Sequence, residues 1–284
     1  MKHRRLSFTV VRSERDQPFI VLMNLVGPIV PKEDNFSKHC ITAEGFRKDM
    51  LCVWNLARKD EQKIEKLVLL VNSPGGSPVQ SAQIARQIRM FRKAFPHIKV
   101  VAYVADICAS GGYFIASQCD EIVCDESSLI GNVGVISMKL GYHGLLQKAG
   151  IESRTMAAGK NKVMGNPFEE RRQRDVDFEQ HLLDALHTTF KKTVIEGRGD
   201  KLKRTRAKEK MRQIFGELEE GVDGLLDGTI YAGAEAVEVG LADRIGYWGL
   251  YSIPKWGGAG WGEKPRWEDF KDRRIITATH SKTP

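Results

Sequence analysis

The sequence predicts an α/β fold with a mostly parallel sheet and helical crossovers, on three observations. Short apolar runs such as KLVLLVN (66–72) and IKVVAYVAD (98–106) are typical of strands buried on both faces of a parallel sheet. Stretches with apolar residues at helical spacing alternate with these runs, as crossover helices do. No Pro/Ser-rich linker interrupts the pattern, so we expect one domain over 18–250, between a basic extension (1–17) and a polar tail (251–284).

The first half of the chain predicts three strands and three helices. A strand and turn at 19–30 precede a helix over 42–60, for which Thr42 is a suitable N-cap. A helix follows each of the two apolar runs. The first of these covers 78–94 and is amphipathic, and the second covers 111–118. The residues expected on the buried side of the 78–94 helix are Val79, Ile84, Ile88 and Phe91.

The second half continues the alternation and then becomes more polar. The predicted elements are a strand at 120–125, a Gly-punctuated turn and strand at 127–137, a helix at 142–150 closed by Gly150, a strand at 151–159 and a helix over 167–196 with an apolar face from Phe168 to Phe190. The stretch 197–228 is charged and contains several glycines. Four tryptophans follow near the C-terminus, where closing the core and packing on a neighbouring subunit are both open: Trp248, Trp256, Trp261 and Trp267.

Composition excludes several protein classes. With 42% hydrophobic residues among 284, the chain is too apolar for a disordered protein. The longest nearly apolar stretch, 19–30, is shorter than a membrane-spanning helix, and the basic N-terminus lacks the apolar region of a secretory signal. Five cysteines without a C-x-x-C pair fit a reducing compartment and predict no metal site. We therefore expect a cytoplasmic protein, with a mitochondrion or another organelle as the alternative, and not an integral membrane protein.

The formal net charge of +8 is local rather than general. The excess of Lys and Arg lies in 1–15 and 154–212, and in the second stretch acidic residues are interleaved as on a solvated helix. Residues 213–228 hold no Lys or Arg and five acidic residues. No aromatic stacking platform accompanies the basic residues, so we expect no nucleic-acid partner.

Two glycine-rich turns stand at strand ends, where ligands bind in α/β sheets. They are NSPGGS at 72–77 and CASGGY at 108–113. Ser110 precedes a Gly pair at the start of a helix, so its hydroxyl has little steric cover. The N–H of Gly111 points beside it, and Gly75 and Gly76 can bring a second N–H close because they lack Cβ. Two converging N–H groups near a serine form an oxyanion hole, although either turn taken alone is more often a simple tight turn, because Gly is the usual turn residue.

A nucleophilic serine also needs a base. Histidines are available, but none lies in a recognisable motif: His39, His97, His143, His181 and His187. Lysine is the alternative, because burial disfavours the ammonium form and leaves a neutral amine. The candidate is Lys162 in AGKNKVMGNP (158–167), a predicted turn between a strand and a helix.

Four segments, taken together and in order, resemble a known family. They are VNSPGGSPVQSA (71–82), ASGGYFIASQCDEIVCDESSLIGNVGVIS (109–137), AGKNKVMGNPFEE (158–170) and YAGAEAVEVGLADRIG (231–246). The chain resembles the signal peptide peptidase A family of serine–lysine peptidases, including its SohB-like members, within the Clp protease/crotonase superfamily. The resemblance covers roughly residues 18–250. An ordered set of four segments is far more specific than a single Gly-Gly turn.

The resemblance implies a role for each candidate. Ser110 is the acylating nucleophile, and Lys162 rather than Lys160 is the general base, since it matches the family's G-x-x-K spacing. Gly76 and Gly111, with Gly75 nearby, supply the oxyanion hole. The resemblance further implies a Clp protease/crotonase-like fold of repeated ββα units, a ring- or dome-shaped homo-oligomer, a peptide substrate, and no metal or organic cofactor.

Three departures from the family pattern refine this hypothesis. Asn132 stands where many members have a lysine-orienting serine, and its amide oxygen still offers an acceptor to the amine. No N-terminal transmembrane helix is predicted, which favours a soluble endopeptidase acting on unfolded polypeptide or released signal peptides. The segment 198–228 is longer and more charged than usual, which makes it a place for an added surface or oligomer contact. The alternatives are a catalytically silent scaffold of the same fold and a crotonase-type acyl-CoA enzyme.

Overall fold

The computed structural model describes residues 8–12, 19–32, 40–59, 64–246 and 274–277. The chain divides into two compact units, one formed by residues 1–133 together with 191–284, and the other by residues 134–190. We refer to them as the sheet unit and the 134–190 unit. The tryptophans at 248–267 lie outside the described residues, so their role stays a prediction.

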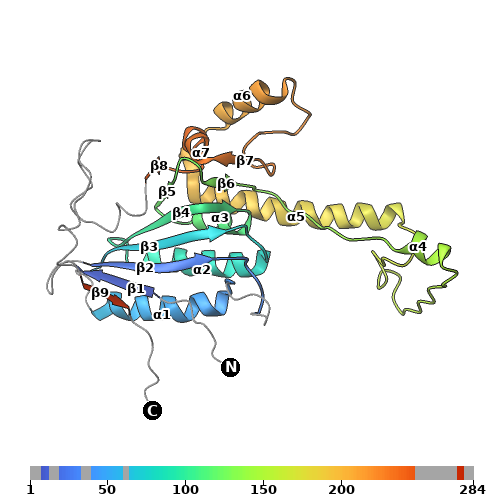
Figure 1. Cartoon of the computed structure of the whole chain (residues 1–284), viewed down its shortest axis with the longest axis horizontal. Helices are drawn as coiled ribbons and strands as arrows, with labels where there is room; N and C mark the ends of the chain where they lie inside the picture. Colours follow the sequence, from blue (N-terminus) through green and yellow to red (C-terminus); the bar gives the residue numbers. More distant parts are fainter. Residues whose placement is uncertain (1–7, 13–18, 33–39, 60–63, 247–273, 278–284) are drawn as a thin grey trace, which may run out of the picture. The chain divides into compact units, whose positions relative to one another are not determined.

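The described residues of the sheet unit form a sheet of nine strands, whose arrangement Figure 1 shows. Its strands are β1 (Phe8–Arg12), β2 (Phe19–Val26), β3 (Ile64–Ser73), β4 (Lys99–Ala109), β5 (Glu121–Cys124), β6 (Leu129–Gly131), β7 (Ile230–Ala232), β8 (Arg244–Ile245) and β9 (Arg274–Thr277). The main path runs β7-β6-β4-β3-β2-β1-β9, and β5 pairs with both β4 and β8. The strands β2 to β6 pair in parallel, whereas β1, β7 and β9 join antiparallel at the two edges. The predicted α/β class with a mostly parallel sheet is therefore confirmed, and it is consistent with a Clp protease/crotonase-like fold.

Helices connect the parallel strands, as the alternation predicted. Those of the sheet unit are α1 (Ala43–Lys59), α2 (Pro78–Ala94), α3 (Gly111–Ala116), α6 (Arg204–Phe215) and α7 (Gly233–Val239), with a short 3-10 turn at Gly199–Lys201. Thr42 Oγ1 accepts the Gly45 N–H at 3.0 Å and Ser77 Oγ accepts the Gln80 N–H at 3.5 Å, so local polar residues fix the starts of α1 and α2.

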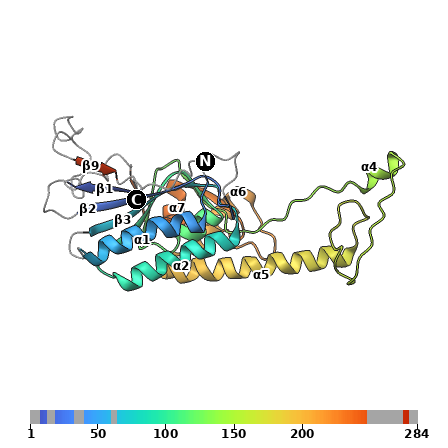
Figure 2. The same cartoon turned by 90° about the horizontal axis from the view of Figure 1, so that it is seen from below.

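Apolar side chains cover both faces of the sheet. On one face α1 and α2 lie side by side (Figure 1, Figure 2), and the Trp54 ring meets the Phe91 and Phe95 rings edge-on at 5.9 and 5.2 Å. On the other face the alternate residues of the central strands form a second cluster: Ile20, Val68, Val101, Tyr103 and Val123. Burial on both faces explains why these strands read as continuous apolar runs.

The 134–190 unit contains α4 (His143–Lys148), a series of turns at 160–165 and most of α5 (Gln173–Arg198), whose last turns belong to the sheet unit. Gly150, with a φ of 68°, follows α4 as predicted. Ser137 Oγ donates to Glu179 Oε1 at 2.6 Å and Lys139 Nζ lies 2.7 Å from the same oxygen. These contacts fasten the extended segment after residue 134 to α5.

Several expected elements differ in the structure. The predicted strand at 151–159 is wrong: residues 151–157 form no ladder, since a strand persists only beside a neighbour. The long helix starts at Gln173 rather than 167, because Asn166 Oδ1 accepts the Phe168 N–H at 3.1 Å and turns the chain first. Val79 is 60% exposed, since at 100° per residue it lies opposite Ile84 and its neighbours on α2. Of the strand predicted at 127–137, only β6 forms.

Candidate active site

Ser110 occupies a strained turn between β4 and α3. Its φ of 51° and ψ of −122° lie in a region that residues with a Cβ rarely adopt, and such strain concentrates at functional sites. Its side chain makes no capping hydrogen bond and is half-exposed, whereas the residues of α3 are buried. The turn is held from two sides, because the Ser110 N–H donates to the Gly131 carbonyl at 2.9 Å and the Tyr113 hydroxyl donates to the Leu241 carbonyl at 2.9 Å. The fold thus presents the Ser110 hydroxyl at the carboxyl end of the sheet.

The first glycine turn lies directly against Ser110. A Cβ built on Gly75 would come within 2.7 Å of Ser110 Cβ and 2.6 Å of the Gly111 nitrogen, so the two turns touch only because Gly75 has no side chain. The Gly75 N–H itself donates to Ser73 Oγ at 3.2 Å. Gly75 therefore gives space, while its own donor is already used.

Gly76 and Gly111 bring two backbone donors together. A Cβ on Gly111 would lie 3.3 Å from the Gly76 nitrogen, which places the two peptide groups side by side. Neither N–H has a hydrogen-bond acceptor among the residues that the structure describes. A Cβ on Gly76, whose φ is 143°, would overlap the carbonyl oxygen of Ile29, so only glycine fits there. Two unused donors beside a serine hydroxyl are the arrangement that stabilises a tetrahedral oxyanion.

The sequence interpretation missed the residues that hold the Gly76 turn. The Ile29 N–H donates to the Gly75 carbonyl and the Ser77 N–H donates to the Ile29 carbonyl, both at 2.8 Å, so the chain after β2 fastens the turn from outside. Ser73 Oγ donates to the Gly27 carbonyl at 2.7 Å and extends this support. The GPI sequence at 27–29 has the composition of an ordinary turn, and the turn it contacts lies more than 40 residues further along the chain. No local sequence pattern therefore predicts this contact.

Asn132 follows directly after the carbonyl that receives the Ser110 N–H. It has a φ of 54°, its side chain is exposed, and its N–H donates to the Thr229 carbonyl at 2.8 Å. Gly131, with a φ of 118°, cannot carry a Cβ without approaching Thr229. The position is therefore fixed by backbone geometry, and no described residue forms a hydrogen bond with the exposed Asn132 amide.

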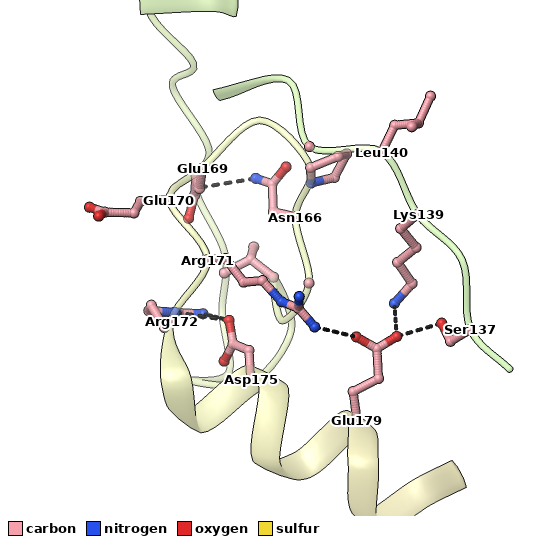
Figure 3. A pocket seen from close by; sticks show the side chains of 14 residues that line it. Ser137, Lys139, Leu140, Asn166, Glu169, Glu170, Arg171, Arg172, Asp175 and Glu179 are labelled. Carbon is pink, nitrogen blue, oxygen red and sulfur yellow. Dashed lines mark hydrogen bonds and ion pairs between the residues drawn. The ribbon is translucent and has the colours of Figure 1, made fainter. Parts of the chain in front are cut away.

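Lys162 belongs to the 134–190 unit. It lies in the turn at 160–165, where its N–H donates to the Gly159 carbonyl at 3.0 Å and its side chain is exposed. The neighbouring Val163 lines a cavity of about 210 Å³ that Figure 3 shows. Charges inside the cavity pair with one another, and the hydrogen bond from Lys139 holds the pKa of Glu179 below its usual value. The cavity walls thus join the end of the lysine turn to the segment 137–141 and to α5.

Other nucleophiles and bases are less suited to the site. Burial raises the pKa of the Cys108 thiol, two residues from Ser110, so it stays protonated. His97 packs edge-on against the Phe95 ring at 6.4 Å, and His39 lies outside the described residues. The remaining candidate histidines all belong to the 134–190 unit: His143, His181 and His187. Within the described part of the chain, no three His, Cys, Asp or Glu side chains are grouped to hold a metal ion.

Residues 93–218 match peptidase family S49, and this range includes Ser110, Asn132 and Lys162. The chain belongs to peptidase family S49. It is 34% identical over 193 residues to the "Putative signal peptide peptidase SppA" of Enterococcus faecium, covering 68% of this chain and 51% of that protein. It is 26% identical over 191 residues to the "Serine protease SPPA, chloroplastic" of Arabidopsis thaliana, covering 66% of this chain and 25% of that protein. The resemblance inferred from the four sequence segments is thereby confirmed.

Another similar protein carries a different name. The "Na(+)/H(+) antiporter NhaA" of Brucella abortus is 39% identical over 181 residues, which are 63% of this chain and 22% of that protein. The S49 chain thus spans about a fifth to a half of the length of these relatives. Among the residues described by the structure, no helix is both long and apolar enough to cross a membrane.

Proposed function

We propose that this S49 chain is a serine endopeptidase in which Ser110 forms the acyl-enzyme. The observation that carries the proposal is the strained Ser110 backbone beside two unused N–H groups, those of Gly76 and Gly111. Acyl transfer requires a nucleophilic hydroxyl held next to paired N–H donors. Backbone strain of the kind seen at Ser110 is typical of sites where such an arrangement is needed. Simple tight turns need neither the strain nor the free donors.

Lys162 is the proposed general base, as the family resemblance implies. Its side chain is exposed in the structure, so the proposal requires the amine to lose its contact with water when it meets Ser110, because burial favours the neutral form of an amine. Asn132, one residue beyond the Ser110 backbone contact, is the proposed acceptor that orients this amine. Its amide oxygen takes the place of the serine hydroxyl found in many family members.

The reaction then follows in two steps. The neutral Lys162 amine takes the Ser110 proton while Oγ bonds to the peptide carbonyl carbon, and the Gly76 and Gly111 N–H groups hold the resulting oxyanion. The ammonium returns the proton to the leaving nitrogen as the C–N bond breaks. Water, activated by the same amine, then hydrolyses the ester and restores the Ser110 hydroxyl.

The proposed substrates are unfolded polypeptides or released signal peptides, because an extended chain can reach a serine at a sheet end. We also propose a homo-oligomer, on the family resemblance. The cytoplasmic location stays a prediction from the cysteine pattern. A silent scaffold and a crotonase-type acyl-CoA enzyme remain the competing hypotheses; the pairing of Ser110 with a family-matched lysine favours the peptidase over the acyl-CoA enzyme.

The decisive experiment combines hydrolysis with covalent labelling. Purified protein is incubated with casein or a fluorogenic peptide, and separately with a serine-directed phosphonate followed by mass spectrometry. We expect cleavage and a single phosphonate adduct on the peptide that contains Ser110. A folded protein that neither cleaves nor labels would contradict the peptidase and support the scaffold. Thioester hydrolysis of an acyl-CoA without peptide cleavage would support the third hypothesis.

Gly76→Ala is expected to lower kcat by about 100-fold, because its new Cβ displaces the turn that presents an oxyanion donor. The measurement is peptide hydrolysis at saturating substrate, with circular dichroism to confirm folding. Gly144→Ala is the matched control, since nothing lies within 4 Å of its added Cβ. Equal rates for the two variants would show that the Gly76 donor is not used.

A further inference from the structure

The cavity of the 134–190 unit is large enough for a small organic molecule. Its volume is about 210 Å³, the space that about seven water molecules take up in the liquid. It lies between the extended segment 137–141, the turn at 163–167 and the first turns of α5 (Figure 3). Apolar side chains form part of its wall: Leu140, Val163 and Pro167. An aliphatic chain packs well on such side chains while its charged ends meet polar groups.

One wall contains a buried carboxylate oxygen without a hydrogen bond. The Asp175 side chain is only 8% exposed, and Arg172 Nε donates to its Oδ2 at 3.0 Å. Its Oδ1 accepts no hydrogen bond, since Arg174 Nε lies 3.8 Å away, which is beyond hydrogen-bond reach. Buried polar atoms almost always have a hydrogen-bond partner. Asp175 Oδ1 is therefore an acceptor that a ligand in the cavity can use.

The cations that line the cavity are already engaged. Lys139 Nζ lies 2.7 Å from Glu179 Oε1, and Arg171 lies 4.0 Å from the other oxygen of the same carboxylate. Arg172 pairs with Asp175. An anionic ligand would have to break one of these ion pairs, so the walls do not favour an anion.

Glu169 provides a second acceptor at the cavity. Its Oε1 accepts a hydrogen bond from the Asn166 amide at 3.0 Å, but its carboxylate forms no ion pair with any residue in the described ranges. In Figure 3 the carboxyl groups of Glu169 and Asp175 lie apart from each other, whereas Glu170 extends away from the other labelled side chains. The cavity thus has two separate acceptors and no free cation among its lining residues.

We propose that this cavity binds a linear aliphatic diamine. One ammonium group donates to Asp175 Oδ1 and the other to Glu169, while the methylene chain packs on Leu140, Val163 and Pro167. A chain of about seven non-hydrogen atoms matches the volume. The binding is independent of the proposed catalysis, because none of these residues takes part in it.

Two other occupants fit less well. A divalent metal ion prefers several oxygen ligands around one point, and among the described residues no three His, Cys, Asp or Glu side chains are grouped in this way. A water molecule alone would satisfy Asp175 Oδ1 but would leave the Glu169 carboxylate without a counter-charge. A diamine supplies both a donor and a charge to each acceptor.

Binding is expected to be visible in the turn that carries Lys162. Val163 and Gly165 line the cavity directly after this lysine, so an occupant holds the turn against α5. We expect 1,5-diaminopentane to slow hydrogen exchange of the backbone amides at 163–167, because exchange requires local opening. Unchanged exchange at saturating diamine would contradict the proposed position of the ligand.

Isothermal titration calorimetry of the full chain with 1,5-diaminopentane tests the proposal. Asp175→Asn and Glu169→Gln are each expected to weaken binding by about tenfold or more, because each removes a charge-assisted hydrogen bond. Asp177→Asn is the matched control: it removes the same charge from α5, but Asp177 bonds to Gln173 and does not line the cavity. We expect it to bind the diamine as the wild type does.

Two related molecules test the chemistry of the ligand. Pentylamine, with one ammonium group, is expected to bind about tenfold more weakly than the diamine, and 1-pentanol is expected not to bind. The proposal is overturned if the diamine gives no binding at up to about 10 mM, well above millimolar affinity. It is also overturned if 1-pentanol or pentylamine binds as tightly, or if Mg²⁺ displaces the diamine from the cavity.

The variants give a separate criterion. Equal affinity of Asp175→Asn, Glu169→Gln and the Asp177→Asn control would show that the diamine binds elsewhere, and would overturn the proposal. Circular dichroism checks that each variant is folded. If Asp175→Asn fails to fold because Arg172 loses its partner, Glu169→Gln decides alone, since it leaves that ion pair intact.

Discussion

Ser110→Ala is expected to reduce kcat for peptide hydrolysis by at least about 1,000-fold and to abolish phosphonate labelling, because no other group at the site can form the ester. Residual activity is expected to come from the Gly76 and Gly111 donors and from substrate binding alone. The fold is expected to persist, since the side chain makes no capping hydrogen bond. Thermal unfolding followed by circular dichroism checks this alongside the kinetics.

The lysine of the proposed dyad has an internal control two residues away. Lys162→Ala is expected to cost about as much in kcat as Ser110→Ala, since residues that act as one unit show non-additive losses. Lys160→Ala removes the same charge from the same exposed turn and is expected to leave kcat within about twofold. The double variant of Ser110 and Lys162 is expected to be no slower than either single variant.

Two results would contradict this dyad. If Ser110→Ala still cleaves at the wild-type rate, another residue is the nucleophile. If Lys160→Ala and Lys162→Ala lose the same amount of activity, the turn contributes only charge or structure, and the base lies elsewhere. Circular dichroism distinguishes a damaged site from an unfolded chain, because a folded Lys162→Ala keeps the wild-type secondary structure while the unactivated Ser110 hydroxyl neither cleaves nor labels.

Local sequence signals predicted the elements that depend on local physics. Thr42 lies immediately before the helix it caps, and the apolar run of β3 requires burial on both faces wherever it lies in the sheet. Ser110 could be selected because a serine before two glycines stands between a strand and a helix. Its positive φ could not be foreseen, because it results from the Gly131 contact and from the crowding around Gly75.

The features that the sequence did not predict depend instead on contacts between distant segments of the chain. The contact between Ile29 and the Gly76 turn joins segments that are distant in the sequence, and neither segment has a pattern that identifies the other. The predicted strand at 151–159 had suitable residues but no neighbouring strand to pair with. The position of Lys162 relative to Ser110 depends on how two compact units meet, which residue types and spacing do not encode. Long-range geometry, rather than composition, thus limits what could be predicted.

A buried ion pair between Arg198 and Asp243 is the basis of the second prediction, a large loss of stability. The Arg198 side chain is fully buried and its guanidinium donates to both carboxylate oxygens of Asp243, at 2.8 and 3.2 Å, and to the Gly240 carbonyl. Asp243 Oδ2 also accepts the Ile122 N–H at 2.7 Å. The pair therefore joins the end of α5 to the start of β5 and to the chain after α7. That chain includes Leu241, whose carbonyl accepts a hydrogen bond from the Tyr113 hydroxyl in α3, the helix that follows Ser110.

Asp243→Asn is expected to lower the free energy of unfolding by about 3–5 kcal/mol at neutral pH, because it leaves the buried guanidinium without a counter-charge. Urea unfolding followed by circular dichroism measures the loss. Adding Arg198→Met in the same chain is expected to restore part of the stability by removing that charge. Glu44→Gln, which breaks an exposed pair with Arg47, is the control and is expected to show no measurable loss.

The same pair predicts how stability depends on pH. Burial alone would raise the pKa of Asp243, but the hydrogen bonds from Arg198 and Lys201 outweigh it and hold the pKa below its usual value. The pair's contribution is therefore complete above the pKa of an unfolded aspartate, about 3.9, and is lost as the pH falls through the lower folded value. Asp243→Asn should remove this part of the acid sensitivity, so the stability gap between wild type and variant should narrow below about pH 4. A gap that stays constant to pH 2 would show that the carboxylate's charge does not stabilise the fold, and that Arg198 is held by its bonds to Gly240 instead.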